Sequence, residues 1–360
     1  MKKYRVGVVG ATGMVGQRFL NLLSNHPWFD VSVLAASAQS AGKPYYEVIK
    51  HRWKLKYDVP EKFRSMVVFD GVNDVKKIVE QVDFVFCAVN MEKEKVASLE
   101  QTYAMLDCPV VSNNSANRFV SDVPMVVPEI NSNHFEVIAH QKKRLKTKRG
   151  FIAVKSNCSI QSYVPAIAAL FDYEPTKICV ATYQAISGAG KTFKDWPEIV
   201  DNVIPFIAGE EEKSEQEPLK IFGRVFDGKI EINKNLKITS QCFRVPVSDG
   251  HTAAVFVSFK KKPSISDIKF QWKNFKGRPQ ELNLPTAPNQ FLHYFEQNDR
   301  PQARLDRDLE KAMAISVGRL RNDTVFDYKF VCLSHNTVRG AAGGAVLMAE
   351  LLAHDGYFDF

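Results

Sequence analysis

The sequence lacks the cysteine patterns of a disulfide-bonded or zinc-binding protein. Its six cysteines form no Cys-x-x-Cys pair, and no cysteines cluster with histidines at the spacing of a zinc site. It also has no apolar run of the roughly 18 residues that a membrane-spanning helix needs, and no recognisable secretory signal. These absences predict a soluble, cytoplasmic protein with no metal site, no membrane partner and no disulfide framework.

The charge pattern does not indicate a nucleic-acid-binding protein either. The chain has a net charge of +8, and six of its basic residues lie within residues 142–149. No nucleic-acid-binding motif accompanies this segment, so a solvated surface is favoured over contact with nucleic acid. A general positive field would also suit phosphorylated, anionic small molecules.

The first part of the chain alternates short β-rich runs with stretches of helical apolar spacing. The β-rich runs are YRVGVVG (4–10), VSVLAAS (31–37), VDFVFCAV (82–89), PVVSNN (109–114) and MVVPEI (125–130). This alternation predicts a parallel sheet covered by helices, that is, an α/β domain of the Rossmann type.

The character of the sequence changes at Cys158. A helix is predicted from there to about Phe171, followed by longer strands such as those at 177–187, 236–247 and 251–259. They predict an α+β domain with a mixed or antiparallel sheet over 158–336. The Gly/Ala-rich turn and helix at 337–360 are expected to pack back onto the first domain, residues 1–157.

The first strand is followed by a glycine-rich turn, VVGATGMVG, with Gly10, Gly13 and Gly16 in G-x-x-G-x-x-G spacing. Small residues let a backbone approach a pyrophosphate, and the helix N-terminus offers free N–H groups. The turn therefore predicts a dinucleotide site. We expect its contacts to come from Gly10, Ala11, Thr12, Gly13, Met14, Val15 and Gly16.

The end of the second strand indicates which dinucleotide binds. Many NAD-binding proteins have an acidic residue there to hold the ribose hydroxyls, but VLAASAQSAGK (33–43) has no carboxylate. Ser37, Ser40 and Lys43 could hold a 2′-phosphate instead, which favours NADP.

Cys158 is the candidate nucleophile. A thiolate is the reactive form of cysteine, and the N-terminus of a helix, where Cys158 is predicted to lie, lowers the pKa of a thiol. The other five cysteines lie mostly in apolar or strand-like runs, as small buried residues do. With a dinucleotide nearby, the thiol could add to an aldehyde, which would then lose a hydride and leave a thioester.

Such chemistry needs an acid/base group, and His251 is the candidate. It follows a tight turn at the start of a strand, seven residues after Arg244. His335 is a competitor because it precedes the Gly/Ala turn at 340–344.

Eight motifs in order along the chain resemble the aspartate-β-semialdehyde dehydrogenase family, in its archaeal and fungal-type branch. The motifs are GATGMVG (10–16), SNNSANRF (112–119), VPMVVPEIN (123–131), SNCSIQ (156–161), QAISGAG (184–190), GEEEK (209–213), FRVPVSDGH (243–251) and NTVRGAAGGAVLMAELL (336–352). They extend over almost the whole chain, so together they are far more specific than any one of them.

The resemblance implies roles for individual residues. It implies Cys158 as nucleophile, His251 as acid/base group and Gln184 as the residue that orients the substrate or acyl intermediate. The implied substrate-binding residues are Arg118 and Lys213 for the phosphate, Glu210 for the ammonium, Arg244 for the α-carboxylate, and Asn157. The implied further cofactor contacts are Ser187, Gly188, Gly190 and Gly343.

The implied reaction is the reversible, NADPH-dependent reductive dephosphorylation of L-4-aspartyl phosphate to L-aspartate-4-semialdehyde through a cysteine thioester, in lysine, methionine and threonine biosynthesis. A homodimer or homotetramer is also implied. The alternatives are malonyl-CoA reductase, N-acetyl-glutamyl-phosphate reductase, whose acetylated substrate has no ammonium for Glu210, and a dinucleotide-binding protein without catalysis. Two positions depart from the family pattern: Gln39 replaces an arginine near the cofactor, and Met348 replaces an asparagine near the nicotinamide.

Overall fold

Two sheets of different kinds organise the chain, and the computed structural model describes them over residues 3–359. The first sheet consists of β1 (Tyr4–Val9), β2 (Phe29–Ala36), β3 (Val68–Asp70), β4 (Phe84–Cys87), β5 (Val110–Ser112), β6 (Met125–Val126) and β7 (Ile152–Lys155). Its order is β3-β2-β1-β4-β5-β7-β6, and every neighbouring pair is parallel. The predicted parallel sheet is confirmed.

The strand order of the first sheet creates a place for a ligand. β1 lies between β2 and β4, so the chain leaves β1 toward one side of the sheet and later returns to its other side. In open parallel sheets, ligands bind at such a switch point, beyond the carboxyl ends of the strands. The glycine-rich turn follows β1 at this point.

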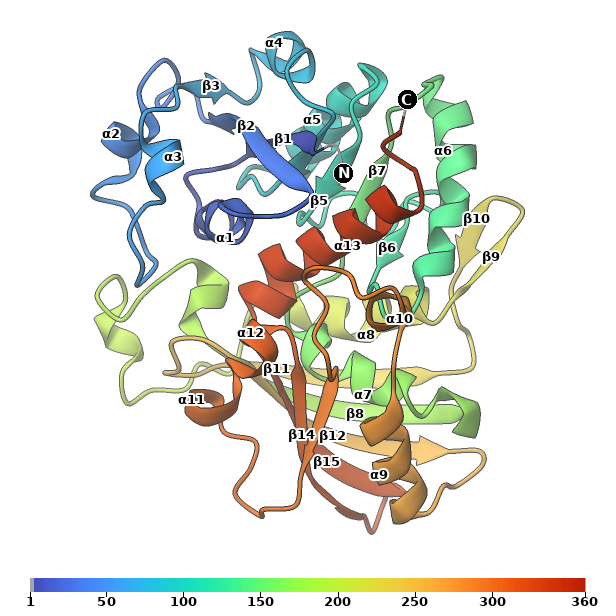
Figure 1. Cartoon of the computed structure of the whole chain (residues 1–360). Coiled ribbons are helices and arrows are strands. Elements are labelled where there is room, and N and C mark those ends of the chain that lie inside the picture. Colours follow the sequence, from blue (N-terminus) through green and yellow to red (C-terminus); the bar gives the residue numbers. More distant parts are fainter. Residues whose placement is uncertain (1–2, 360) are drawn as a thin grey trace.

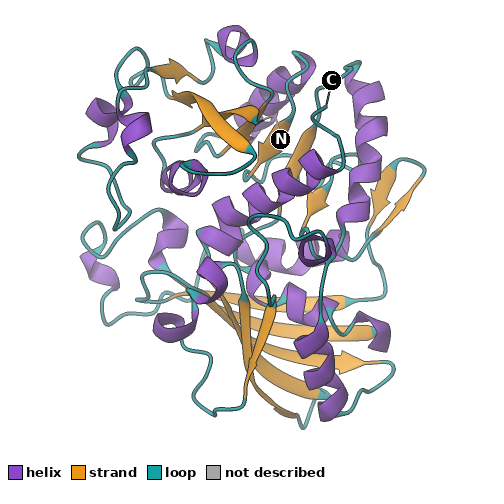
Figure 2. Cartoon of the chain, viewed as in Figure 1, coloured by secondary structure: helices purple, strands orange, loops and turns teal. Residues whose placement is uncertain are grey.

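The second sheet is mixed, as the sequence predicts. It consists of β8 (Pro175–Gln184), β11 (Lys237–Arg244), β12 (His251–Phe259), β13 (Leu292–Phe295), β14 (Ile315–Asn322) and β15 (Tyr328–Ser334), in the order β11-β8-β12-β15-β14-β13. β8 pairs in parallel with β11 and antiparallel with β12. A separate hairpin consists of β9 (Arg224–Phe226) and β10 (Lys229–Glu231). Figures 1 and 2 show the two sheets in opposite halves of the molecule.

Helices flank both sheets (Figure 2). The α-helices are α1 (Met14–Leu23), α2 (Tyr45–Ile49), α3 (Glu61–Arg64), α4 (Val75–Val79), α5 (Lys93–Met105), α6 (Ile138–Leu145), α7 (Val164–Ala168), α8 (Glu210–Ile221), α9 (Ile265–Asn274), α10 (Arg278–Glu281), α11 (Ala303–Asp306), α12 (Leu309–Ala312) and α13 (Gly343–His354). The other helical turns are η1 (Ser132–Val137), η2 (Ile160–Ser162), η3 (Phe171–Tyr173), η4 (Ile186–Ala189), η5 (Pro197–Ile199) and η6 (Val338–Ala342), which is a π-helix. Within residues 3–359, no helix combines the length and apolarity needed to cross a membrane.

The C-terminal helix α13 follows the second sheet in the chain but packs against the first half of the molecule. It packs against α1, β5 and β7, and in Figure 1 it runs diagonally between the two sheets. Its Glu350 is fully buried and lies 2.8 Å from Nε2 of His26. The preceding turn η6 contacts α1, where Nε of Arg18 donates to Thr337 Oγ1 at 3.0 Å. η6 is thereby held against the helix that starts at the glycine-rich turn.

The prediction of a continuous helix from Cys158 to Phe171 is wrong. The segment contains instead a turn at Cys158, the 3-10 turn η2 and the five-residue helix α7. Asn157 explains the turn, because its Oδ1 accepts hydrogen bonds from the backbone N–H and the hydroxyl of Ser159, both at 2.7 Å. Pro165, which has no N–H to donate, fits only near the start of a helix, and α7 begins at Val164.

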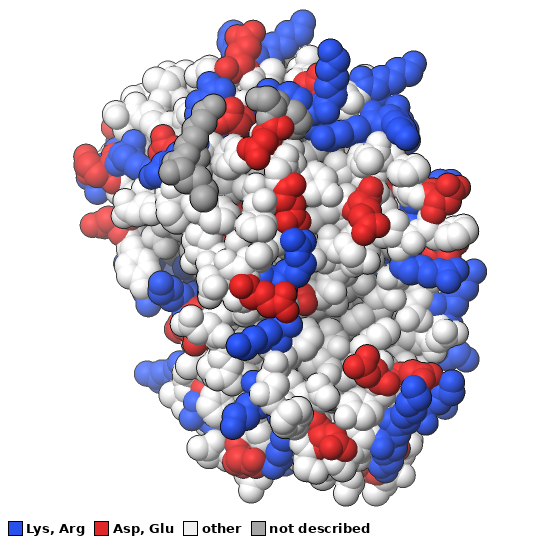
Figure 3. Space-filling model, turned by 45° about the vertical axis from the view of Figure 1, so that its right-hand side comes forward, with Lys and Arg blue, Asp and Glu red and all other residues white. Residues whose placement is uncertain are grey.

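The basic segment at 142–149 covers the end of α6 and the loop that follows. Arg144 pairs with Asp122, and Asp107 Oδ1 accepts from the backbone amides of Lys148 and Arg149 at 2.8 Å. On the face drawn in Figure 3, basic and acidic side chains are interspersed. The segment thus has local partners of its own.

Candidate active site

Cys158 and His251 lie side by side. Cys158 is in the loop after β7, and His251 is the first residue of β12, so one comes from each half of the molecule. The Cys158 Sγ is 3.4 Å from the His251 Nε2. Cys158 is partly exposed, whereas Cys87, Cys108, Cys242 and Cys332 are buried. A partly exposed cysteine whose sulfur contacts an imidazole is suited to nucleophilic chemistry.

The backbone fixes the tautomer of His251. The Ala185 N–H donates to His251 Nδ1 at 3.0 Å, so Nδ1 is an acceptor and the ring proton lies on Nε2, facing Cys158. Burial lowers the pKa of His251 well below its usual value, Arg244 and His335 lower it further, and a contact with the Gly250 backbone opposes them only in part. The ring is therefore neutral and presents an N–H to the sulfur.

His335, the competing histidine, has other partners. Its Nδ1 accepts from the Val338 N–H at 3.3 Å, and its Nε2 lies 3.9 Å from Asp308. Burial lowers its pKa to about 4. Of the two histidines, His251 is the one that faces the thiol.

The expected lowering of the Cys158 pKa by a helix N-terminus is wrong. No helix begins at Cys158, and burial raises the pKa of its thiol to about 11, with Glu210 raising it further. The cations Lys155, Arg118 and Arg244 act in the opposite direction but only partly compensate. In the resting protein the thiol is thus protonated at neutral pH.

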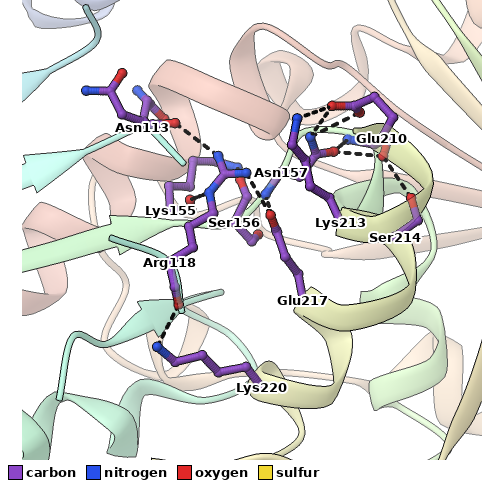
Figure 4. Close-up of polar contacts among 12 residues, drawn as sticks. Asn113, Arg118, Lys155, Ser156, Asn157, Glu210, Lys213, Ser214, Glu217 and Lys220 are labelled. Atoms are coloured by element: carbon purple, nitrogen blue, oxygen red, sulfur yellow. Dashed lines mark hydrogen bonds and ion pairs between the residues drawn. The ribbon is translucent and has the colours of Figure 1, made fainter. Parts of the chain in front are cut away.

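Three predicted site residues contact the carboxylate of Glu210. Its carboxylate accepts hydrogen bonds from Asn157 Nδ2 at 2.9 and 3.0 Å and from Gln184 Nε2 at 3.2 Å. It also pairs with Lys213 Nζ at 2.8 Å (Figure 4). The structure brings these four residues together, but the Glu210–Lys213 pair means that the lysine is not free at rest.

The Arg118 guanidinium is buried, and three of its N–H groups already have protein partners. Its Nε donates to the Lys155 carbonyl at 2.9 Å, one terminal nitrogen pairs with Glu217 at 2.8 Å, and the other donates to the Asn113 carbonyl at 3.0 Å (Figure 4). A guanidinium has five N–H groups, so two remain for a ligand. Lys220 supports this loop from α8, since its Nζ donates to the carbonyls of Arg118, Val120 and Val123.

Arg244 is a buried guanidinium near Cys158 and His251. It is 6% exposed, and one terminal nitrogen donates to the Ala185 carbonyl at 2.6 Å. Among residues 3–359, no carboxylate is found within 4.0 Å of it. A Cβ on Gly188 would lie 2.9 Å from this guanidinium and 3.2 Å from His251 Nε2, so the glycine leaves room in front of both groups. A buried cation without a carboxylate is a candidate for binding an anionic ligand.

A cleft of about 590 Å³ lies beyond the carboxyl ends of β1–β4. Gly10, Thr12 and Gly13 line it, as does Ser37 at the end of β2. Gly10 has φ +94°, and a Cβ on it would lie 2.3 Å from the Ala88 carbonyl oxygen, so the turn requires glycine there. Gly16 packs equally closely on Gly10, but Gly13 has only one neighbour within 4 Å, at 3.6 Å. The open position is the one where a pyrophosphate could approach.

The other predicted cofactor residues lie in several places. Ser40 is buried, and Lys43 Nζ donates to the Gln39 carbonyl at 3.1 Å; the cleft lining includes neither. Ser187 accepts from Asn336 Nδ2 at 2.9 Å. Four further predicted residues do not line the cleft, namely Ala11, Met14, Val15 and Gly16. Gly190 ends η4 with φ +69°, and Gly343 packs against Met313 and Val338, where α13 begins.

Three site residues were missed by the sequence analysis. Lys155 is buried beside Cys158, Glu217 pairs with Arg118, and Arg52 lines the cleft with Ser37. A lysine inside the apolar run FIAVKSNC was a usable signal for Lys155, because lysine is seldom fully buried. Glu217 lies seven residues after Glu210, on the same face of α8.

Gly13 and Gly16 are expected to respond differently to substitution. Gly13→Val should weaken NADP binding by about tenfold to 100-fold, because its side chain enters the open cleft, with little change in thermal stability. Gly16→Ala should lower the melting temperature, because its Cβ would lie 2.2 Å from the Gly10 carbonyl oxygen. Fluorescence titration with NADPH and thermal unfolding measure the two effects. Equal loss of stability in both variants would contradict this assignment.

Two family models match the chain. Residues 5–138 match the semialdehyde dehydrogenase NAD-binding domain, and residues 167–339 match the semialdehyde dehydrogenase dimerisation domain. The dinucleotide cleft lies in the first region, and His251 and Arg244 lie in the second.

Curated and solved proteins are similar over nearly the whole chain. Aspartate-semialdehyde dehydrogenase of Archaeoglobus fulgidus is 43% identical over 350 residues, 97% of this chain and 98% of the relative. The Schizosaccharomyces pombe enzyme of the same name is 42% identical, covering 98% of both chains. The crystal structure of aspartate semialdehyde dehydrogenase with NADP from Candida albicans superposes with a TM-score of 0.88 at 36% identity, covering 99% of this chain and 100% of that one.

Proposed function

The chain belongs to the aspartate-semialdehyde dehydrogenase family, and from this premise we propose how its own residues carry out the reaction. It is an NADP-dependent enzyme that converts L-4-aspartyl phosphate and NADPH reversibly into L-aspartate-4-semialdehyde, NADP and phosphate. This step belongs to the biosynthesis of lysine, methionine and threonine.

The glycine cleft suits NADP, which supplies the hydride. Gly13 leaves the pyrophosphate position open, next to the start of α1, whose free N–H groups and positive dipole end favour an anion. We propose that Ser37 and Arg52, which both line the cleft, bind the 2′-phosphate. Lys43 is close to them in the sequence and is a further candidate. No carboxylate follows β2 to repel that phosphate.

Arg244 and Glu210 recognise the two charged groups at the α-carbon of the substrate. Arg244 can bind the α-carboxylate through two N–H groups, as a lysine could not. Glu210 receives the ammonium. Since Glu210 already accepts from three side chains, the ammonium replaces one of them, and Lys213 is the one with a charge to transfer elsewhere.

The released Lys213, together with the two remaining N–H groups of Arg118, binds the phosphate. Both cations offset the charge on the leaving group as it departs. Asn157 and Gln184 keep their hydrogen bonds to Glu210 and so orient its carboxylate toward the substrate ammonium.

Cys158 is the nucleophile. Its thiolate attacks the acyl carbon, the bond to phosphate breaks, and a thioester remains on the sulfur; after reduction the carbon–sulfur bond breaks and the aldehyde leaves. His251 is the acid/base group, because its Nε2 lies 3.4 Å from the sulfur and can exchange protons there and at the oxygen that becomes negatively charged.

The assembly and location of the enzyme are also proposals. The dimerisation-domain match supports a homodimer or homotetramer, as does the alternating pattern of β12, where Thr252, Ala254 and Phe256 are only partly buried. We propose that the chain divides into two domains, residues 1–157 together with 337–360, and residues 158–336.

We also propose that the enzyme is cytoplasmic, because a free catalytic thiol suits a reducing compartment.

The observation that supports this function best is the 3.4 Å contact between Cys158 Sγ and His251 Nε2, in front of the otherwise unpaired Arg244. The test is phosphate-dependent reduction of NADP by L-aspartate-4-semialdehyde, run beside NAD. We expect NADP reduction that requires phosphate. NADPH oxidation by malonyl-CoA, without turnover of the semialdehyde, would refute the proposal.

A further inference from the structure

Arg52 is the cation that lines the glycine cleft, and within residues 3–359 no other lysine or arginine does so. It lies in the loop between α2 and α3 and is exposed. In the same range, no carboxylate oxygen lies within 4.0 Å of its guanidinium. Lys43 does not line the cleft, and its Nζ donates to the Gln39 carbonyl. A guanidinium without a carboxylate partner is suited to binding a phosphate through two N–H groups.

The cleft also has a negative charge, at Asp70. This residue ends β3 and lines the cleft together with Arg52. Its oxygens accept hydrogen bonds from the Val72 N–H at 2.9 Å and from the Asn73 side chain at 2.8 Å. Burial raises the pKa of this carboxyl, but the hydrogen bonds outweigh it, so Asp70 is ionised at neutral pH. A phosphate in this part of the cleft therefore needs a cation held in place.

Gln17 fixes the loop that carries Arg52. Gln17 lies in the first turn of α1 and is 1% exposed. Its Nε2 donates to the Arg52 carbonyl at 3.0 Å, and its Oε1 accepts from the Lys54 N–H at 2.7 Å. One side-chain amide thus binds the backbone on both sides of Trp53.

The same amide holds the glycine-rich turn. Its Nε2 also donates to the Thr12 carbonyl at 3.1 Å, and the Gln17 backbone N–H donates to the Gly13 carbonyl at 2.9 Å. Thr12 and Gly13 line the cleft, as does Arg52. Gln17 therefore ties the turn to the loop that supplies the positive charge.

The loop has little regular structure of its own to hold Arg52. Residues 51–57 form neither helix nor strand. Two further contacts of the loop come from other side chains, since Lys54 pairs with Asp195 and Trp53 Nε1 donates to the Tyr57 carbonyl. Neither contact binds the backbone of Arg52. A loop that is already ordered binds its ligand at a smaller entropic cost, so the Gln17 contact favours binding by Arg52.

We propose that Gln17 sets the preference of this chain for NADP over NAD, by holding Arg52 in position for the 2′-phosphate. Gln17 is a positioning residue, because it acts through Arg52. The inference rests on the proposed function, which places the 2′-phosphate at Ser37 and Arg52, and adds the buried residue that orients the cation. The contact of Gln17 with Thr12 concerns a turn that both dinucleotides use, so it affects both equally.

The test is fluorescence titration of the whole protein with NADPH and with NADH, in the absence of substrate. The measured quantity is the ratio of the two dissociation constants. Arg52→Ala should raise the Kd for NADPH by about tenfold to 100-fold and change the Kd for NADH by less than about twofold. Gln17→Met has nearly the same size but no amide. It should weaken the binding of both, and that of NADPH by about fivefold to tenfold more than that of NADH.

Tyr45→Phe is the matched control. The Tyr45 hydroxyl is buried and donates to the Ala11 carbonyl of the same glycine-rich turn at 2.8 Å, rather than to residues 52–54. This variant should change the affinities for NADPH and NADH by the same factor. A loss of preference as large as that of Gln17→Met would show that the turn, and not Arg52, carries the effect, and would overturn the inference.

The double variant tests whether Gln17 acts through Arg52. Adding Gln17→Met to Arg52→Ala should leave the ratio where Arg52→Ala alone puts it, because the two residues share one contact to the phosphate. A further loss of preference would overturn the inference, as would a wild-type ratio in Gln17→Met. An unchanged ratio in Arg52→Ala would overturn it even if Gln17→Met failed to fold. The titrations use no substrate, so failure of the semialdehyde assay would refute the proposed function separately.

Discussion

Replacing Cys158 with alanine is expected to lower turnover in both directions by about 10⁴-fold or more, because no thioester can form. NADP binding should stay within about twofold of the wild type, since Cys158 does not line the glycine cleft. Initial rates with semialdehyde, phosphate and NADP measure the first effect, and NADPH fluorescence titration measures the second. Retained turnover would refute Cys158 as the nucleophile.

Cys158→Ser separates the nucleophile from its surroundings. A serine hydroxyl fits the same space but ionises much less readily than a thiol. We therefore expect turnover to fall by about 10³-fold or more. Cys179→Ala is the matched control, because Cys179 is also partly exposed but lies in β8. Its turnover should remain close to that of the wild type.

The sequence was sufficient to predict the first sheet and its ligand edge. Parallel strands buried on both faces have continuous apolar runs, and a glycine turn after the first strand has few other uses. The structure shows that the three glycines have different roles. Gly10 and Gly16 are needed for the packing of the turn, and Gly13 leaves the cleft open. The mixed second sheet was predictable from its longer alternating strands.

The sequence could not predict the environment of the nucleophile. Apolar spacing after Cys158 is similar for a continuous helix and for the broken turn that Asn157 and Pro165 produce. The pKa of the thiol depends on burial and on Glu210, which is 52 residues away in the chain. Likewise, the tautomer of His251 depends on the amide of Ala185, which only folding brings to it.

Arg244 is a buried cation whose charge and remaining N–H groups are expected to find partners when the substrate binds. Its guanidinium is buried near Cys158 and Glu210, and burial lowers its pKa from the usual value. The Ala185 carbonyl satisfies only part of its five N–H groups. The α-carboxylate of the substrate would both neutralise the charge and accept two of the remaining hydrogens.

Arg244→Ala is therefore expected to lower kcat/KM for L-aspartate-4-semialdehyde by about 10²- to 10³-fold, because it leaves the substrate carboxylate buried and unpaired. Arg244→Lys should recover only a minor part, since an ammonium keeps the charge but not the two-pronged geometry. Arg144→Lys, a change at the surface ion pair with Asp122, is the control and should have no effect on kcat/KM.

The decisive comparison uses the amino aldehyde that lacks the α-carboxylate. Wild type and Arg244→Ala should process it at similar, low kcat/KM, because neither can form the missing contact. If Arg244→Ala lowered kcat/KM equally for both aldehydes, the arginine would act on the fold or on Cys158 rather than on the carboxylate. Because the guanidinium also helps lower the pKa of the thiol, alkylation of Cys158 in the variant measures that second contribution directly.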